Sequence, residues 1–320
     1  MTIRRLFQKI KRVATKVKSF PQCIIAWHYL RSIKEPNEAI FVTSCAIGDI
    51  VFGMAYINTW ANEHKDYNPV VIADSTKRDI FDAYSGVERI VYLDKNSNIG
   101  NKILIKYNRS KLFSYLGKSC HIYNTIPIQI FGTSYHKSCL ELLKKYLEIK
   151  DTTIQYPTLK NENHSGKKIL EYNYSSTNVI VINPYSSGSE QCPCIDVITD
   201  IIKYYSSKGY MLFSNVVGNQ RPLPGTEALS CSLKDFYVIA DNVHAVISER
   251  SGIMDWLINT KAKKVILYPD RGNAYIKNID YKEMFGMKQW NKDNVLEVFL
   301  WEEELSKAKN IIIEYLDEEI

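Results

Sequence analysis

The regular alternation of short apolar runs with helical stretches constrains the fold of this chain more than any other feature. In the first half, short runs rich in β-branched residues alternate with segments whose apolar residues have the spacing of a helix. In order, the expected strands are 39–43, 70–73, 89–93 and, less clearly, 121–123, and the expected helices are 49–64 and 76–84. Strands that alternate with helices form βαβ units and a parallel sheet.

A second series of the same kind follows a polar, irregular stretch at 149–177. Its expected strands are 179–183, 210–213, 243–247 and 265–268, and its expected helices are 195–208, 232–240, 252–259 and 293–316. At roughly 150 residues per domain, 320 residues fit two domains. The sequence therefore predicts an α/β protein with Rossmann-like domains over 37–165 and 166–320, behind an N-terminal helical segment over 1–36.

The positive charge is concentrated in that N-terminal segment. Residues 1–34 hold nine Lys or Arg and no Asp or Glu, whereas the rest of the chain holds 32 basic and 35 acidic residues. A nearly neutral body argues against a broad nucleic-acid surface. Over 2–20, apolar residues recur at spacings of three and four opposite the basic ones, as in helices that lie on a membrane surface. The alternative is a helix that packs on its own domain.

Targeting signals and disulfides are not expected. No apolar run reaches the ~18 residues of a membrane span, and the short run 23–27 leads into charged residues, unlike a signal peptide. Seven cysteines without a CxxC pair fit reduced thiols. We expect a cytoplasmic protein held at the inner face of the cell membrane, with an anionic membrane surface as the partner of residues 1–20.

Functional residues should follow the strands, because open parallel sheets bind ligands at their carboxyl ends. Gly48 and Asp49 follow the first strand and open the first long helix. Gly48 would allow a close turn of the backbone. Asp49 would be either an acidic group able to accept a proton or a helix cap.

In the second domain, Arg250, Ser251 and Gly252 lie between a strand and a helix. Free N–H groups at the helix start and a guanidinium suit a phosphate. Arg250 could instead form a structural ion pair with Glu249, Asp255 or Glu227.

Two more loops follow strands of the second domain and are rich in turn-forming residues. In the loop 214–227, Asn215, Gly218 and Glu227 are candidates for the nucleotide of a donor, with Glu227 suited to a ribose diol. In the loop 183–189, Ser186 and Ser187 are candidate donors to a phosphate. The alternative for both segments is a plain surface loop.

Gly48-Asp49 before an apolar helix resembles the N-terminal loop of heptosyltransferase-like glycosyltransferases, the ninth sequence family of that class. The resemblance implies a GT-B fold of two facing Rossmann-like domains, and metal-independent, inverting transfer from a nucleotide-sugar. It makes Asp49 the base on the acceptor hydroxyl. Ser251-Gly252 matches the family's Thr-Gly near the donor diphosphate, while Arg250 replaces an aspartate and Asp255 takes the approximate place of a histidine. No lysine occurs over 183–202 for the family's phosphate contact, so Ser186 and Ser187 would substitute.

The sequence thus predicts a glycosyltransferase of bacterial surface-polysaccharide assembly, such as capsule or lipopolysaccharide. Its donor would be held by the second domain, and a glycan or lipid-linked acceptor by the first. We expect no metal, no cofactor beyond the nucleotide-sugar substrate, and no nucleic acid, since neither metal-ligand spacing nor an Asp-x-Asp after a strand occurs. The alternatives are a non-catalytic binding or scaffold protein and a sugar-nucleotide epimerase of the same shape.

Overall fold

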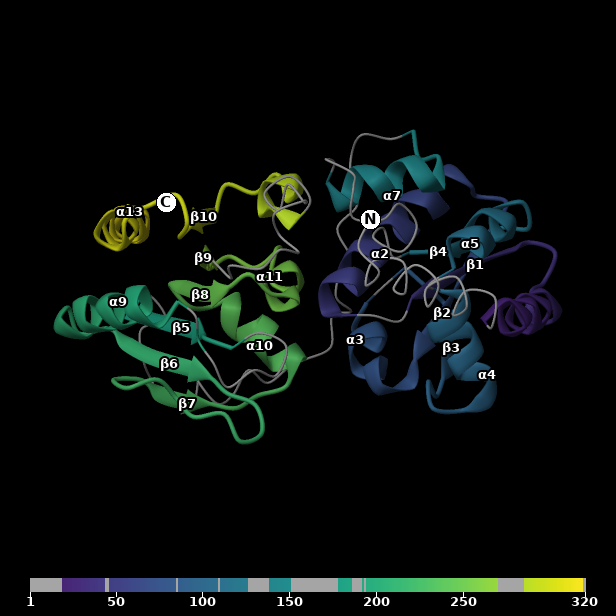
Figure 1. Cartoon of the computed structure of the whole chain (residues 1–320). Helices are drawn as coiled ribbons and strands as arrows, with labels where there is room; N and C mark the ends of the chain where they lie inside the picture. Colours follow the sequence, from purple (N-terminus) through teal and green to yellow (C-terminus); the bar gives the residue numbers. More distant parts are fainter. Residues whose placement is uncertain are drawn as a thin grey trace, which may run out of the picture. The chain divides into compact units, whose positions relative to one another are not determined.

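The computed structural model describes residues 19–43, 46–84, 86–108, 110–125, 138–150, 178–185, 192, 194–269 and 285–318. The chain divides into two compact units, which we call unit 1 (Met1–Lys160) and unit 2 (Asn161–Ile320). Each unit has one parallel β-sheet with helices on both faces (Figure 1). The expected α/β class with Rossmann-like parallel sheets is confirmed.

Unit 1 is built on a four-stranded sheet of order β3-β2-β1-β4. Its elements are β1 (Glu38–Thr43), α2 (Ile47–Glu63), β2 (Asn68–Asp74), η1 (Ser75–Lys77), α3 (Arg78–Ala83), β3 (Arg89–Leu93), α4 (Asn98–Gly100), the π-helical η2 (Asn101–Tyr107), α5 (Lys111–Lys118), β4 (Ile122–Asn124) and α7 (Cys139–Leu147). The order reverses between β1 and β4, so the topological switch point lies where Thr43 and Asn124 end these strands.

The two faces of this sheet are covered by different helices. A helix over residues 19–33 buries Cys23, Ala26 and Leu30, spaced by three and four, against the face that carries Ile40 and Val42. Phe41 points to the opposite face, where its ring lies 5.2 Å from that of Trp60 in α2. Of the helix expected over 2–20, only residues 19 and 20 belong to the described part, and both are helical.

Unit 2 is built on a six-stranded sheet of order β10-β9-β8-β5-β6-β7, in which every pair is parallel. Its elements are β5 (Val179–Asn183), α9 (Ile195–Ser207), β6 (Met211–Asn215), β7 (Glu227–Leu229), α10 (Leu233–Ala240), β8 (Ala245–Glu249), α11 (Gly252–Trp256), β9 (Lys263–Tyr268), η5 (Met287–Trp290), β10 (Val295–Phe299) and α13 (Leu305–Asp317). The switch point lies between β5 and β8.

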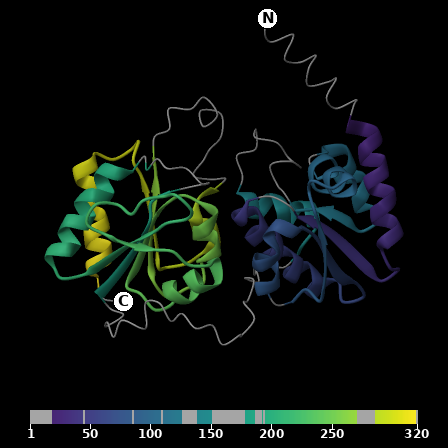
Figure 2. The same cartoon turned by 90° about the horizontal axis from the view of Figure 1, so that it is seen from below.

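Alternation along the strands again divides the core of unit 2 between two faces. Ile180 and Ile182 of β5 share one buried cluster with residues of α9 and α13, such as Ile198 and Ile312. The other face is covered by α10 and α11 (Figures 1 and 2). Trp256 of α11 is tied to α10, because its indole N–H donates to the carbonyl of Leu233 at 3.0 Å.

Two strands of unit 2 were not among the expected ones, the short edge strand β7 and the strand β10. The sequence predicted a single helix over 293–316, which is wrong: β10 (Val295–Phe299) adds a sixth strand beside β9, and α13 begins only at Leu305. The run is rich in β-branched and aromatic residues, which suit a strand once a neighbouring edge is available. No helix in the described part of the chain combines the length and the apolar character that crossing a bilayer requires.

Candidate functional site

Polar side chains form a chain across three neighbouring strand ends of unit 2. Asn183 ends β5, and its amide group donates to the hydroxyl of Ser248 in β8 at 3.0 Å. The amide group of Asn215, the last residue of β6, donates to the Asn183 side-chain oxygen at 2.8 Å. All three residues are buried. Asn183 is the last residue of β5 and Ser248 the last but one of β8, the two strands between which the order reverses, so these groups lie at the expected ligand edge of the sheet.

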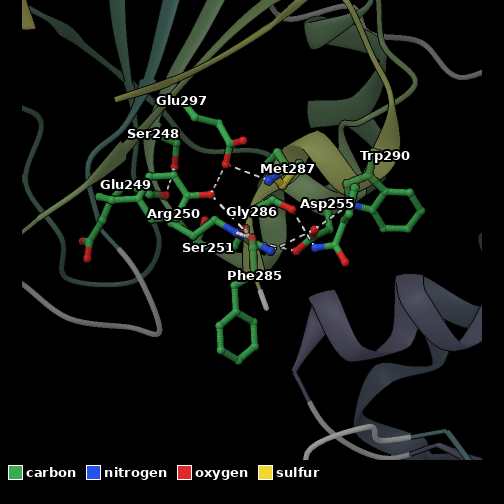
Figure 3. A network of polar contacts seen from close by, with 12 residues as sticks. Ser248, Glu249, Arg250, Ser251, Asp255, Phe285, Gly286, Met287, Trp290 and Glu297 are labelled. Atoms are coloured by element: carbon green, nitrogen blue, oxygen red, sulfur yellow. Dashed lines mark hydrogen bonds and ion pairs between the residues drawn. The ribbon is translucent and has the colours of Figure 1, made fainter. Parts of the chain in front are cut away.

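Arg250, directly after β8, is held in a buried ion pair. Its two terminal nitrogens donate to the two carboxylate oxygens of Asp255 in α11 at 2.8 and 3.0 Å. The side chains of Arg250 and Asp255 are only 6% and 1% exposed. The guanidinium also donates to the carbonyls of Ser251 at 2.7 Å and Phe285 at 2.9 Å. Figure 3 shows the Glu249 carboxylate directed away from this pair.

These contacts mean that the Arg250 side chain mainly stabilises the conformation of the loop to which it belongs. Of the three alternative partners that the sequence offered, Asp255 is the one that the guanidinium contacts. The pair is bidentate and shielded from water, so most of the positive charge is already balanced. Burial raises the pKa of the Asp255 carboxyl, while the Arg250 guanidinium and the Trp290 indole N–H oppose that rise.

A second set of contacts fixes the segment against which Arg250 rests. The Trp290 indole N–H donates to Asp255 at 3.1 Å. Glu297 of β10 accepts hydrogen bonds from the backbone N–H groups of Met287 at 2.7 Å and Lys288 at 3.0 Å, and from the Tyr268 hydroxyl at 2.5 Å (Figure 3). The strand β10, which the sequence did not predict, therefore supports the loop after β8 through Glu297.

Ser251 and Gly252 begin the short helix α11. Ser251 is its N-cap residue, but its hydroxyl makes no capping bond. Within the described part of the chain, that buried hydroxyl has no hydrogen-bond partner. A buried hydroxyl that lacks a partner costs free energy, so a ligand that hydrogen-bonds it would gain affinity.

The other predicted donor residues are spread more widely. Gly218 adopts a positive φ of 64° in the loop after β6, a conformation that favours glycine. Glu227 is exposed at the first residue of the edge strand β7, away from the switch point. Loops after β5 and β6 are nevertheless tied together, since the Tyr185 hydroxyl donates to the Arg221 carbonyl at 2.7 Å. Ser186 and Ser187 lie outside the described residues.

In unit 1, Asp49 lies in the first turn of α2, next to the switch point of that sheet. The N-cap residue is Ala46, which provides no side-chain cap, so Asp49 is not the capping residue itself. Asp49 is half-buried, and a carboxylate is favourable at the positive end of the helix dipole. Gly48 is buried inside the helix, so the tight turn expected at that residue is absent.

Thr43 adds a polar group that the sequence did not single out. It is the last residue of β1 and fully buried, and its hydroxyl has no partner among the described residues. Thr125 follows β4 across the switch point and donates weakly to the Val42 carbonyl at 3.4 Å. Asn183, Ser248 and Thr43 share one sequence signal: each is a polar residue at or near the end of an otherwise apolar strand.

Over the described ranges, no group of three or more His, Cys, Asp or Glu side chains is arranged to hold a metal ion.

Solved structures share this fold. A glycosyl transferase of family 9 from Veillonella parvula matches with a TM-score of 0.60 and 14% identity, over 87% of this chain and 91% of that one. The ADP-heptose lipopolysaccharide heptosyltransferase II of E. coli matches with a TM-score of 0.59 and 10% identity, over 87% and 98%. E. coli heptosyltransferase WaaC with ADP matches with a TM-score of 0.55 and 10% identity, over 87% and 99%.

At these identities the likeness establishes the fold. It confirms the expected GT-B architecture and, at that level, the resemblance to heptosyltransferase-like glycosyltransferases. No protein-family model and no curated protein sequence matches the chain.

Proposed function

We propose that this protein is a glycosyltransferase that moves a sugar from a nucleoside-diphosphate donor to a glycan or lipid-linked acceptor of a bacterial surface polysaccharide. The observation that carries the proposal is the polar edge of unit 2, where Asn183, Asn215 and Ser248 line the switch point of a sheet with the fold of family 9 transferases. The comparison structures support a nucleotide donor, since one of them contains ADP.

The donor would bind along this edge of unit 2. The Ser251 hydroxyl and the backbone N–H groups after β8 would donate to the diphosphate, and the Asn215 and Gly218 loop would contact the nucleoside. Glu227 would reach a ribose diol only with a ligand that extends to the edge strand. Arg250 would act mainly by fixing the 248–252 backbone through Asp255. Ser186 and Ser187 remain candidates for the diphosphate.

Asp49 would act as the general base of the acceptor side. It would remove the proton from the acceptor hydroxyl as that oxygen attacks the anomeric carbon, and the bond from that carbon to the diphosphate would break with inversion. The nucleoside diphosphate would leave with the bonding electrons, stabilised by hydrogen-bond donors after β8. We propose that no metal takes part, because the sequence lacks an Asp-x-Asp after a strand.

The Asp49→Asn variant tests this proposal. Transfer should fall by ~10²-fold or more, as expected of a general base, while nucleoside-diphosphate binding to unit 2 stays unchanged. Asp79→Asn, in the first turn of α3, is the matched control and should transfer normally. Near-normal turnover by Asp49→Asn would return Asp49 to a structural role at the start of α2.

One observation favours a non-catalytic binding or scaffold protein as a second candidate. The one arginine expected near the diphosphate already has a buried carboxylate partner. Nucleotide binding without any transfer, in both the parent chain and Asp49→Asn, would support that candidate.

The positive charge of the N-terminal segment leads us to propose where in the cell the protein is located. Residues 1–20, with seven Lys or Arg and no acid, would hold the protein at the anionic inner leaflet of the cell membrane, in the cytoplasm.

A further inference from the structure

A second acid-free segment lies in unit 1. Residues 95–140 contain seven Lys or Arg and no Asp or Glu, as residues 1–34 contain nine and none. The other 240 residues hold 25 basic and 35 acidic side chains. The positive charge of the chain is therefore carried by two segments that are far apart in the sequence.

The fold brings the described parts of these two segments together. Cys23, Ala26 and Leu30 of the helix over 19–33 share one buried cluster with Ile103 of η2 and Phe113 of α5. The rings of Phe20 and Phe113 lie 5.6 Å apart. In both Figures 1 and 2 the helix over 19–33, in purple, lies beside α5. The described helix over 19–33 and α5, one from each basic segment, therefore lie side by side in unit 1.

The outer side of α5 is apolar although it faces solvent. Leu112, Tyr115 and Leu116 are 53%, 48% and 47% exposed, and their spacing of three and four places them on one face of the helix. Phe20 next to α5 is 47% exposed, and Lys111 is exposed as well. We call Phe20, Lys111, Leu112, Tyr115 and Leu116 the α5 face.

The orientation of α5 is fixed by its buried side. A Cβ atom on Gly117 would lie 2.2 Å from the Tyr107 hydroxyl and 2.4 Å from the Ile122 carbonyl oxygen, so the helix packs as closely as a glycine allows. The Ser110 hydroxyl caps the helix by accepting from the Phe113 N–H. Turning the α5 face inward would break these contacts, so its exposure is a built feature of the fold.

We propose that the α5 face is a docking surface for an anionic lipid bilayer. Leu112 and Leu116 would enter the boundary between headgroups and acyl chains, Tyr115 would lie at the headgroup level, and Lys111 would be attracted by anionic lipid. A nucleic acid would not use exposed leucines, since its contacts are mainly phosphate and base edges. This inference goes beyond the proposed transfer reaction and needs no substrate.

Vesicle sedimentation of the full chain tests it. Vesicles of phosphatidylcholine that contain about one third phosphatidylglycerol, enough to give a negative surface potential, are compared with vesicles of pure phosphatidylcholine. Leu112→Ser/Leu116→Ser should lower the partition coefficient about 25-fold, because burying half of a leucine side chain is worth roughly fivefold. Leu305→Ser, equally exposed on α13 of unit 2, is the matched control and should bind like the parent.

Insertion of the α5 face into the bilayer is measured separately with Leu112→Trp. Brominated lipids should quench the fluorescence of the introduced tryptophan. This variant keeps an apolar group at the position, so it reports on contact even if the double serine variant is poorly folded. Unchanged binding by a folded double variant, or no quenching of Leu112→Trp in sedimented protein, would overturn the proposal. If the parent chain self-associates but does not bind vesicles, and the double variant is monomeric, the α5 face would be a contact with a second copy of the chain. That result would also overturn the proposal.

Discussion

Removing one partner of the Arg250–Asp255 ion pair should strongly destabilise unit 2. Both side chains are almost fully buried, and four hydrogen bonds of the guanidinium end on Asp255, Ser251 and Phe285. Breaking a buried pair by removing one charge costs about 3–5 kcal/mol, because the other charge remains in a water-free site. We therefore expect Arg250→Met and Asp255→Leu each to lower the free energy of unfolding by about that amount.

The double variant separates the pair from its surroundings. Arg250→Met/Asp255→Leu removes both charges, so its loss should be smaller than the sum of the two single losses by about 2 kcal/mol or more. It should not return to the parent value, because the Trp290 indole N–H loses its acceptor.

Urea unfolding followed by hydrogen exchange of peptides from β8 and β9 reports on unit 2 itself. Lys307→Met, which breaks the exposed ion pair of Lys307 with Glu303 in the same unit, is the control and should leave the midpoint unchanged. Single losses below about 1 kcal/mol, or single losses that add in the double variant, would refute the assignment of Arg250 to a structural pair.

Arg250→Ala should weaken ADP binding more than adenosine binding only if Arg250 also touches the diphosphate; equal weakening, measured by calorimetry, would confine it to its structural pair. Burial lowers the pKa of Lys264 to about 7, so between pH 7 and 9 the unfolded chain binds a proton that the folded chain lacks, and the free energy of unfolding should rise by up to ~1.4 kcal/mol per pH unit. Lys264→Met should remove this pH dependence of the urea midpoint. A pH dependence that persists in the variant would show that Lys264 does not cause it. Deleting residues 2–18 should lower affinity for anionic vesicles by about a hundredfold or more at low salt and by less at high salt; unchanged sedimentation would exclude the basic segment as an anchor.

Most of the fold could be predicted because its strands are unbroken apolar runs. Arg89–Leu93 and Val179–Asn183 have the bounds that the sequence indicates. Residue types at helix ends also follow their usual local preferences: Ser232 caps α10 by accepting from the Asp235 N–H at 3.1 Å, and Gly209 follows α9 with a φ of 79°. These features depend on residues that are close in the sequence, so they can be predicted from the sequence alone.

The strands at the sheet edges could not be predicted in the same way. Glu227–Leu229 and Val295–Phe299 become strands because β6 and β9 offer open edges, which only the folded sheet provides. The candidate site shows the same limit. The sequence placed Arg250 and Asp255 in one motif but left three partners open, and only the geometry of α11 selects Asp255. The Asn183–Ser248 contact joins residues 65 apart, so no local pattern indicates it.

Binding of nucleoside diphosphates to the full chain tests the central claim most directly. Calorimetric titration with ADP, UDP, GDP and CDP should find at least one that binds, and hydrogen exchange should show protection at the ends of β5, β6 and β8. Asn183→Ala, which removes the amide that joins Asn215 to Ser248, should weaken that binding, while Asn242→Ala, at an exposed residue before β8 and so at the opposite end of the sheet, should not. If none of the four binds to a folded chain, or if protection falls outside unit 2, the proposed donor site is contradicted.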